Sequence, residues 1–157
     1  MSLPGGSGKV WEKLKHLSVH KTMISTEVDH LIYRAEESHQ VSNLLLDQGH
    51  DLFSAMWSYH TMQCLVEALL LSKGSEISKP STMLAAYVRE FSKPGLLHPR
   101  FHRYLLEAKK RHDIAHYGLN KRVSNEDARA SHQWAEEFMQ AVKKYLEVYV
   151  LPEQELF

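Results

Sequence analysis

The sequence predicts an all-α protein, folded as an up-and-down bundle of four to five helices. Apolar side chains recur every three or four residues in several long stretches, which is the period of an amphipathic helix. No stretch alternates apolar and polar residues for long enough to predict a convincing β-strand. The predicted helices are joined by connections of two to about ten residues, and connections this short are typical of an up-and-down bundle.

Length and composition limit the class of protein. A chain of 157 residues with 43% hydrophobic content can bury one substantial core. The formal net charge is zero, so no global field marks a nucleic-acid binder. The single cysteine, Cys64, excludes an intramolecular disulfide and suggests a reducing compartment. The most apolar stretch, 65–71, is far shorter than the ~20 residues that span a bilayer, and no secretion signal opens the chain. We therefore expect a cytoplasmic protein with no membrane partner.

The two ends of the chain differ in composition from its middle. Residues 1–9 are rich in Gly, Ser and Pro and contain little to bury, so they predict a flexible leader. Residues 10–152 form the expected single helical domain, and residues 153–157 form a short tail.

The first helices are predicted from their apolar spacing and from glycines. A short helix is expected over 10–17. The first long helix should begin at Thr26 and stop at Gly49, because glycine readily adopts the left-handed conformation that ends a helix. The next should begin at Asp51 and end at Gly74. Its apolar residues cover most of its circumference, which predicts the central helix of the bundle.

The remaining helices follow prolines and a capping sequence. A linker that contains Pro80 leads to a short helix over 82–91. Another helix takes Pro99 into its first turn and ends at Gly118. Residues 124–127, Ser-Asn-Glu-Asp, are a variant of the capping box and begin the final helix.

Residues 109–118 carry the densest set of chemically capable side chains, in the order KKRHDIAHYG. Arg111 offers a planar cationic fork suited to phosphate oxygens, and His112 and His116 titrate near neutral pH. At ~100° per residue, His112 and His116 lie about 40° apart on a helix, whereas Arg111 and His116 diverge by about 140°. Convergence of Arg111 and His116 therefore requires a bent helix end or a second chain.

Four segments together carry a family pattern. They are an early helix through 29–35, the sequence MQCLVEALL at 62–70, RHDIAH at 111–116 and AEEF at 135–138. In this order and spacing, over roughly 26–150, they resemble the HEPN domains of prokaryotic toxin–antitoxin and related systems. The resemblance implies a helical homodimer in which an Arg and, after four to six residues, a His line a cleft between two protomers.

Active members of that family are metal-independent endoribonucleases, so the resemblance implies roles for individual residues. Arg111 would stabilise the charge of the phosphorane-like transition state, and His116 would take the 2′-hydroxyl proton or protonate the leaving 5′-oxygen. His112 or Asp113 would orient the catalytic groups or the RNA, with Tyr117 also in support. The expected product ends in a 2′,3′-cyclic phosphate.

Two positions depart from the commonest pattern of that family. His112 stands where many active toxins have Asn or Asp, and Gly118 stands where they have Tyr. Tyr117 follows His116 directly, and in paired systems a Tyr in this region can be modified by a nucleotidyltransferase antitoxin. The alternative prediction is therefore a non-catalytic partner module that binds a nucleotidyltransferase or a nucleotide through the same groove.

The local charge around the motif is compatible with an RNA substrate. Residues 98–122 contain seven Lys and Arg against two acidic residues, a formal excess of five. Such a patch can follow a phosphate backbone, although the C-terminus of a helix commonly gathers cations because of its dipole. The candidate RNA-binding residues are Arg103, Lys109, Lys110, Lys121 and Arg122.

Three histidine pairs at four-residue spacing raise the alternative of a metal site. The pair His112 and His116 lacks the glutamate of a zinc-protease helix, and eleven histidines produce such spacings by chance. We therefore expect no resident metal and no cofactor. The other two pairs are His16 with His20 and His98 with His102.

Several aromatic residues and one further histidine have structural interpretations. Their helical spacings are typical of core or dimer contacts rather than of base stacking. His60 is expected to be an interior histidine. The aromatic residues are Trp57, Tyr59, Tyr104, Trp134 and Phe138.

Overall fold

The computed structural model describes residues 7–75, 79–118 and 121–149. Within these ranges the chain is helical and contains no β-strand, which confirms the predicted all-α class. None of the described helices has the length and apolar content needed to cross a membrane. The helices are α1 (Ser7–Asp47), α2 (Asp51–Ser72), α3 (Pro80–Tyr87), the π-helical turn η1 (Val88–Ser92), α4 (Arg100–Tyr117) and α5 (Asn125–Tyr149).

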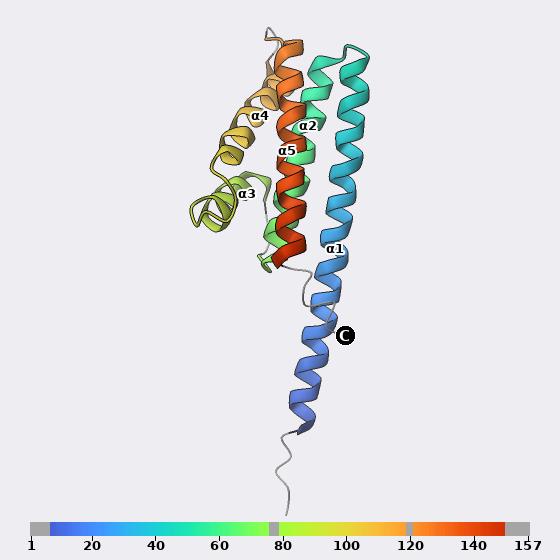
Figure 1. The fold of residues 1–157 in the computed structure, drawn as a ribbon, viewed down its shortest axis with the longest axis vertical. Helices are drawn as coiled ribbons and strands as arrows, with labels where there is room; N and C mark the ends of the chain where they lie inside the picture. The colour runs from blue at the N-terminus through green and yellow to red at the C-terminus, as the bar shows by residue number, and fades with distance from the viewer. Residues whose placement is uncertain (1–6, 76–78, 119–120, 150–157) are drawn as a thin grey trace, which may run out of the picture.

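The helices form an up-and-down bundle around α2. Figure 1 shows α1, α2 and α5 running side by side, with α3 and α4 on the opposite side of α5 from α1. Helix α2 contacts α1, α5, α4 and α3, and its contact with α1 is the most extensive of the bundle. The first part of α1 continues beyond the end of the bundle.

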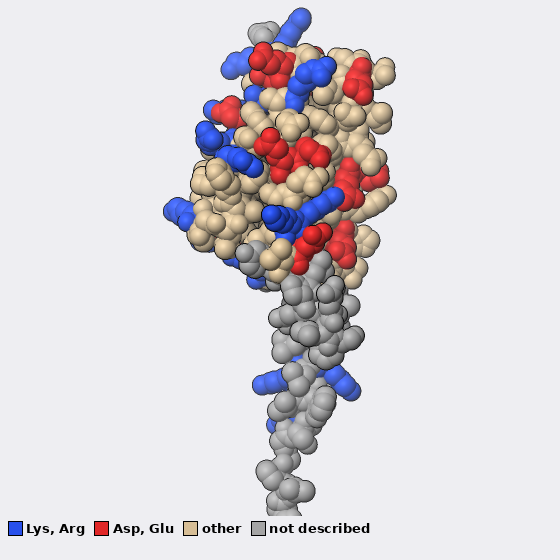
Figure 2. Space-filling view, in the orientation of Figure 1, with Lys and Arg blue, Asp and Glu red and all other residues tan. Residues whose placement is uncertain are grey.

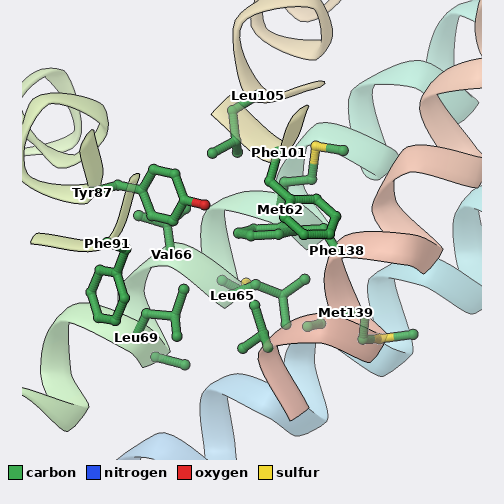
Figure 3. Packing of buried hydrophobic residues seen from close by; sticks show 14 of the residues in the cluster. Met62, Leu65, Val66, Leu69, Tyr87, Phe91, Phe101, Leu105, Phe138 and Met139 are labelled. Atoms are coloured by element: carbon green, nitrogen blue, oxygen red, sulfur yellow. The ribbon is translucent and has the colours of Figure 1, made fainter. Parts of the chain in front are cut away.

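Burial explains why α2 is central. Eleven of its residues are buried, including Met62, Leu65 and Leu69, which have no exposed surface. Phe101 of α4 and Phe138 of α5 pack on them with ring centroids 5.4 Å apart, as Figure 3 shows. Each fully buried side chain of this size contributes about 1.5–3 kcal/mol relative to exposure. The contacts of the bundle therefore converge on one helix.

The ends of α1 and α2 match their predicted terminators. Gly49 and Gly74 have φ angles of +82° and +73°, a region that favours glycine. Gly118 ends α4 for a different reason. Its φ is −91°, so it does not use the left-handed conformation that Gly49 and Gly74 adopt. A Cβ at Gly118 would lie 2.8 Å from the carbonyl oxygen of Ile114, so a side chain is excluded by close backbone approach. The Oγ of Ser124 accepts a hydrogen bond of 3.0 Å from the Asp127 amide, which confirms the predicted cap of α5.

Two predicted helix boundaries are wrong. The predicted short helix over 10–17 and the separate start at Thr26 are one continuous helix from Ser7 to Asp47. No Gly or Pro interrupts residues 9–48, so Thr26 has no break upstream to cap. Pro80 lies in the first position of α3 rather than in a linker, where its missing N–H costs nothing. Residues 1–6 and 150–157 lie outside the described ranges, so the division into leader, domain and tail stays a prediction.

A polar cluster joins α1, α2 and α5 inside the bundle. The Ser42 Oγ lies 2.7 Å from the Ser58 Oγ and 3.0 Å from His132 Nδ1, and Ser54 donates a 2.8 Å bond to the Ser42 carbonyl. The ring of His39 stacks on His132 with centroids 4.1 Å apart. Burial, with a smaller contribution from His39, lowers the pKa of His132, so its ring is neutral at pH 7. The hydrogen bonds among Ser42, Ser54, Ser58 and His132 fix the register of the three helices.

Tyr87 carries a buried hydroxyl with no hydrogen-bond partner among the described residues. Its ring is fully buried between Phe91 and Phe138, and Figure 3 shows the hydroxyl directed into the apolar core near Leu105. Burial raises the pKa of the phenol. An unpartnered buried hydroxyl costs about 1–3 kcal/mol, so this residue weakens the core in which it lies.

Replacing Tyr87 by Phe should therefore raise the free energy of unfolding by about 1 kcal/mol, measured by urea denaturation. Tyr104→Phe is the matched control, because the Tyr104 hydroxyl donates a 2.9 Å bond to Glu137 and its loss should lower stability by a similar amount. A loss of stability in both variants would contradict the assignment.

Candidate functional site

The candidate site lies at the C-terminal end of α4, where the buried face of the helix becomes polar. Phe101, Leu105 and Ala108 form the buried row that packs α4 against the bundle. Continuing this row by three or four residues reaches Arg111 and His112. Polar groups in such a row must find partners inside the protein. The partners that Arg111 and His112 find therefore determine the arrangement around the motif.

Arg111 is bound to α5. Its Nη1 donates to the Asp127 carbonyl oxygen at 2.9 Å and to the Ser131 Oγ at 2.8 Å, and its Nη2 lies 3.4 Å from the Asp127 carboxylate. The guanidinium carbon lies 4.5 Å from the centre of the Trp134 ring, which stacks on Tyr104 from α4. Only 15% of the Arg111 side chain is exposed. Arg111 therefore holds the last turns of α4 against α5.

His112 occupies a half-buried position between α4 and α2. Its ring lies 4.9 Å from Tyr59 and 4.6 Å from His116, centre to centre, and its Nδ1 lies 3.4 Å from an oxygen of Asp113. Burial lowers the pKa of His112, while the hydrogen bond to Asp113 opposes this shift. The ring is therefore a neutral base at pH 7, next to the exposed His116.

One chain does not bring Arg111 and His116 together. The contacts of Arg111 go to α5, whereas the ring of His116 lies against His112 and Tyr117. This divergence agrees with the helical angle expected from the sequence. The helix continues regularly to Tyr117, so α4 supplies no bent end.

The candidate RNA-binding residues are exposed, and two of them have acidic partners. Lys109 lies 3.3 Å from Asp113 and Lys110 lies 3.2 Å from Glu107. Exposed pairs of this kind contribute little and are screened by salt, so both lysines remain able to meet a phosphate. On the face in Figure 2, basic side chains predominate along the edge formed by α3 and α4, whereas acidic ones cluster over α5 and α1. Arg103, Lys121 and Arg122 are also exposed.

The sequence did not identify every residue at this site. Asp127 and Ser131 hold Arg111, and their spacing of four residues on α5 is the signal that was available. Tyr59 borders His112 rather than only filling the core. His60 is exposed, so its predicted interior position is wrong.

No group of three or more His, Cys, Asp or Glu within the described ranges is placed to hold a metal ion. The Nδ1 of His98 accepts a 3.1 Å bond from the Arg100 amide instead of facing His102. The side chains of His16 and His20 lie outside the description.

Comparison with known proteins decides the family. A family model described as the HEPN domain matches residues 28–145, a region that includes every residue discussed above at the end of α4. This chain belongs to the HEPN family. Its predicted family resemblance is thereby confirmed, and the helical bundle described here is the HEPN fold of this chain.

Curated relatives of this HEPN chain come from archaea and bacteria. A protein of Methanocaldococcus jannaschii named "Putative toxin MJ0142" is 28% identical over 130 residues, which cover 83% of this chain and 88% of the relative. A "UPF0332 protein" of Thermotoga maritima is 35% identical over 118 residues, covering 73% and 86%. Another UPF0332 protein, from Gloeobacter violaceus, is 27% identical over 124 residues, covering 78% and 98%.

Arg111→Ala should lower the free energy of unfolding of this HEPN chain by about 2–3 kcal/mol. The substitution leaves the fully buried Ser131 hydroxyl without its donor and removes the contact with Trp134. Arg111→Lys should lose less, because lysine keeps the charge but not the planar fork. Urea denaturation measures both. The exposed Arg103→Ala is the control, and an equal effect of Arg111→Ala and Arg103→Ala would contradict a stabilising role for Arg111.

Proposed function

We propose that this chain is a metal-independent endoribonuclease of the toxin type, which cleaves RNA at a site shared by two copies of the chain. The observation that carries the proposal is the imidazole pair at the end of α4. A neutral His112 and an exposed His116 lie 4.6 Å apart, in the segment that resembles the Arg and His motif of the family and within the region that the family model matches. The archaeal relative, named a putative toxin, supports a toxin setting.

The chemistry requires a base, an acid and a cationic group near one phosphate. An imidazole takes the 2′-hydroxyl proton, and the 2′-oxygen attacks phosphorus. The bond to the 5′-oxygen breaks as an imidazolium gives that oxygen a proton, leaving a 2′,3′-cyclic phosphate and a 5′-hydroxyl. His116 is the proposed acid or base at each of two equivalent sites, where it acts with Arg111 of the second chain and has the His112 ring 4.6 Å away. The Nδ1 of His112 lies 3.4 Å from the Asp113 carboxylate, and this contact fixes the ring against which His116 lies. His112 and Asp113 thereby orient His116.

Arg111 is the proposed stabiliser of the developing phosphate charge. Three hydrogen bonds to α5 engage both N–H groups of Nη1 and one of Nη2. The Nε and the second Nη2 hydrogen have no partner among the described residues, and they can donate to phosphate oxygens. A guanidinium already fixed by α5 loses little freedom on binding, which favours electrostatic stabilisation of a transition state.

The surface proposed for the homodimer is the exposed strip of α2 next to the imidazole pair. Phe53 is 52% exposed and Trp57 is 40% exposed, and both lie about one turn apart on the same face as His60. Partial burial and the charges of Arg34 and His112 lower the pKa of His60. Its neighbour on α2, Tyr59, lies 4.9 Å from His112 of α4, ring to ring. Tyr117 at the end of α4 is a further exposed aromatic residue, with 82% of its surface accessible, and its ring lies 5.7 Å from His116. Clustered apolar residues of this kind commonly mark an interface.

A second function has one observation in its favour. The Arg111 side chain is already engaged by α5, so its structural contacts are sufficient to explain its presence. This favours a non-catalytic partner module that binds a nucleotidyltransferase antitoxin or a nucleotide. Such a module has no need of His116, whereas a ribonuclease depends on it.

The test is incubation of end-labelled RNA with the purified chain in excess EDTA. We expect cleavage that leaves 2′,3′-cyclic phosphate ends, because the attacking oxygen belongs to the substrate. His116→Ala should reduce the rate at least about 100-fold, in line with the usual contribution of a general acid or base. His98→Ala, which changes an exposed histidine outside the site, should leave the rate unchanged.

Rates are compared only for variants with the same oligomeric state and the same denaturation midpoint as the parent. Full activity of His116→Ala would reject the proposed site. Absence of cleavage in the parent, together with retained binding of a nucleotidyltransferase by His116→Ala, would support the partner module instead.

A further inference from the structure

A groove of about 610 Å³ lies between α2, α3, η1 and α4. This volume falls in the range of pockets that hold small ligands or single nucleotide units. Its floor is apolar and includes Val66, Leu84 and Leu105. Val66 and Leu105 also belong to the buried core, so the floor is rigid. A rigid apolar floor suits a flat ring better than a hydrated chain.

The rim of the groove is cationic. Arg89, Lys93, His102 and Lys109 line it, and no Asp or Glu does. Charge complementarity therefore selects an anionic occupant. Arg89 pairs with the partly buried Glu90, and Lys109 pairs with Asp113. Both cations are themselves exposed, so each can still meet an anion in the groove.

The π-helical turn η1 carries one cation of the rim, Arg89, and one acidic neighbour, Glu90. Arg89 and Lys93 line the groove, while Glu90 accepts a 2.8 Å bond from Ser75, beyond the end of α2. Lys73 donates a further 2.9 Å bond to the Glu90 carbonyl oxygen. One carboxylate oxygen of Glu90 is thus held on the Ser75 side, while the other lies 3.6 Å from Arg89. Single π-turns in helical proteins frequently occur at functional sites.

The groove borders the imidazole pair. Tyr59 lines it and lies 4.9 Å from His112, ring to ring. Burial raises the pKa of Tyr59, so its hydroxyl remains protonated and able to donate at neutral pH. Beside it, the Gln63 amide hydrogen-bonds the Tyr59 hydroxyl and keeps its other donor and acceptor capacity for a ligand. An aromatic ring beside an amide is a common arrangement for holding and reading an unstacked base.

We infer that this groove binds the base of a single-stranded RNA nucleotide next to the cleaved phosphate, with the flanking phosphates on Arg89, Lys93 and Lys109. The inference rests on the proposed ribonuclease function and extends it, because it assigns base selection to Tyr59 and Gln63. Bases stack on aromatic side chains with modest sequence preference, and the phosphate contacts make the binding dependent on salt.

The probe is a fluorescein-labelled hexanucleotide with 2′-O-methyl groups, which cannot be cleaved through its 2′-oxygen. Binding to the full chain is measured by fluorescence anisotropy at low salt. Lys93→Glu and Ala85→Trp alter the rim and fill the groove at exposed positions. Each should raise Kd about tenfold or more, as expected for loss of one phosphate contact or one stacked base. Lys144→Glu and Gln133→Trp make the same changes at exposed positions of α5 and should shift Kd less than about twofold.

Equal effects of the groove variants and their α5 controls would overturn the inference, as would absence of hexanucleotide binding by the parent. So would a hexaglutamate peptide that binds as tightly as the RNA with the same response to the variants, because the groove would then recognise only negative charge. Cleavage of unmodified RNA separates the two proposals. Binding in the groove without cleavage rejects the ribonuclease alone. Cleavage that groove variants leave unchanged rejects the groove alone.

Discussion

The rest of the structure depends on the burial of α2. Apolar side chains cover this helix so completely that α1, α4 and α5 must each pack against it. The contact with α4 sets where the histidine motif lies, and the strip of α2 left uncovered contains Phe53, Trp57 and His60. The same packing places Tyr59 between His112 and the groove. Core packing and site geometry therefore have one origin, and a change in the α2 core should disturb both.

The elements that could be predicted are those specified by local chemistry. Gly49 and Gly74 end helices because of their own backbone freedom, and Ser124 caps α5 with its own hydroxyl. The start expected at Thr26 was wrong because a cap begins a helix only where the upstream chain leaves the helical path. The partners of Arg111 depend on which part of α5 faces α4, and a helical period carries no information about a neighbouring helix. The groove depends on the π-turn, which no residue type specifies.

Arg111 is subject to two demands. Its fork binds Asp127 and Ser131 and thereby secures the end of α4, while the proposed reaction requires it to face a phosphate. Both demands are compatible if the remaining N–H groups face a cleft formed with another chain. His116 lies on a different side of α4 and is exposed, so a second copy is the simplest source of the missing partner group. In a symmetric dimer each chain then contributes one residue type to each of two equivalent sites.

The most direct test of a shared site is complementation between two inactive variants. Arg111→Gln and His116→Ala chains are purified separately, mixed, unfolded and refolded together, and then assayed with end-labelled RNA in EDTA. If Arg111 of one chain acts with His116 of its partner, random pairing makes half of the dimers mixed and leaves one of their two sites intact, so roughly a quarter of the parent rate should return. Mixed dimers that form, as confirmed by mass spectrometry, and yet remain inactive would contradict a site built from two chains.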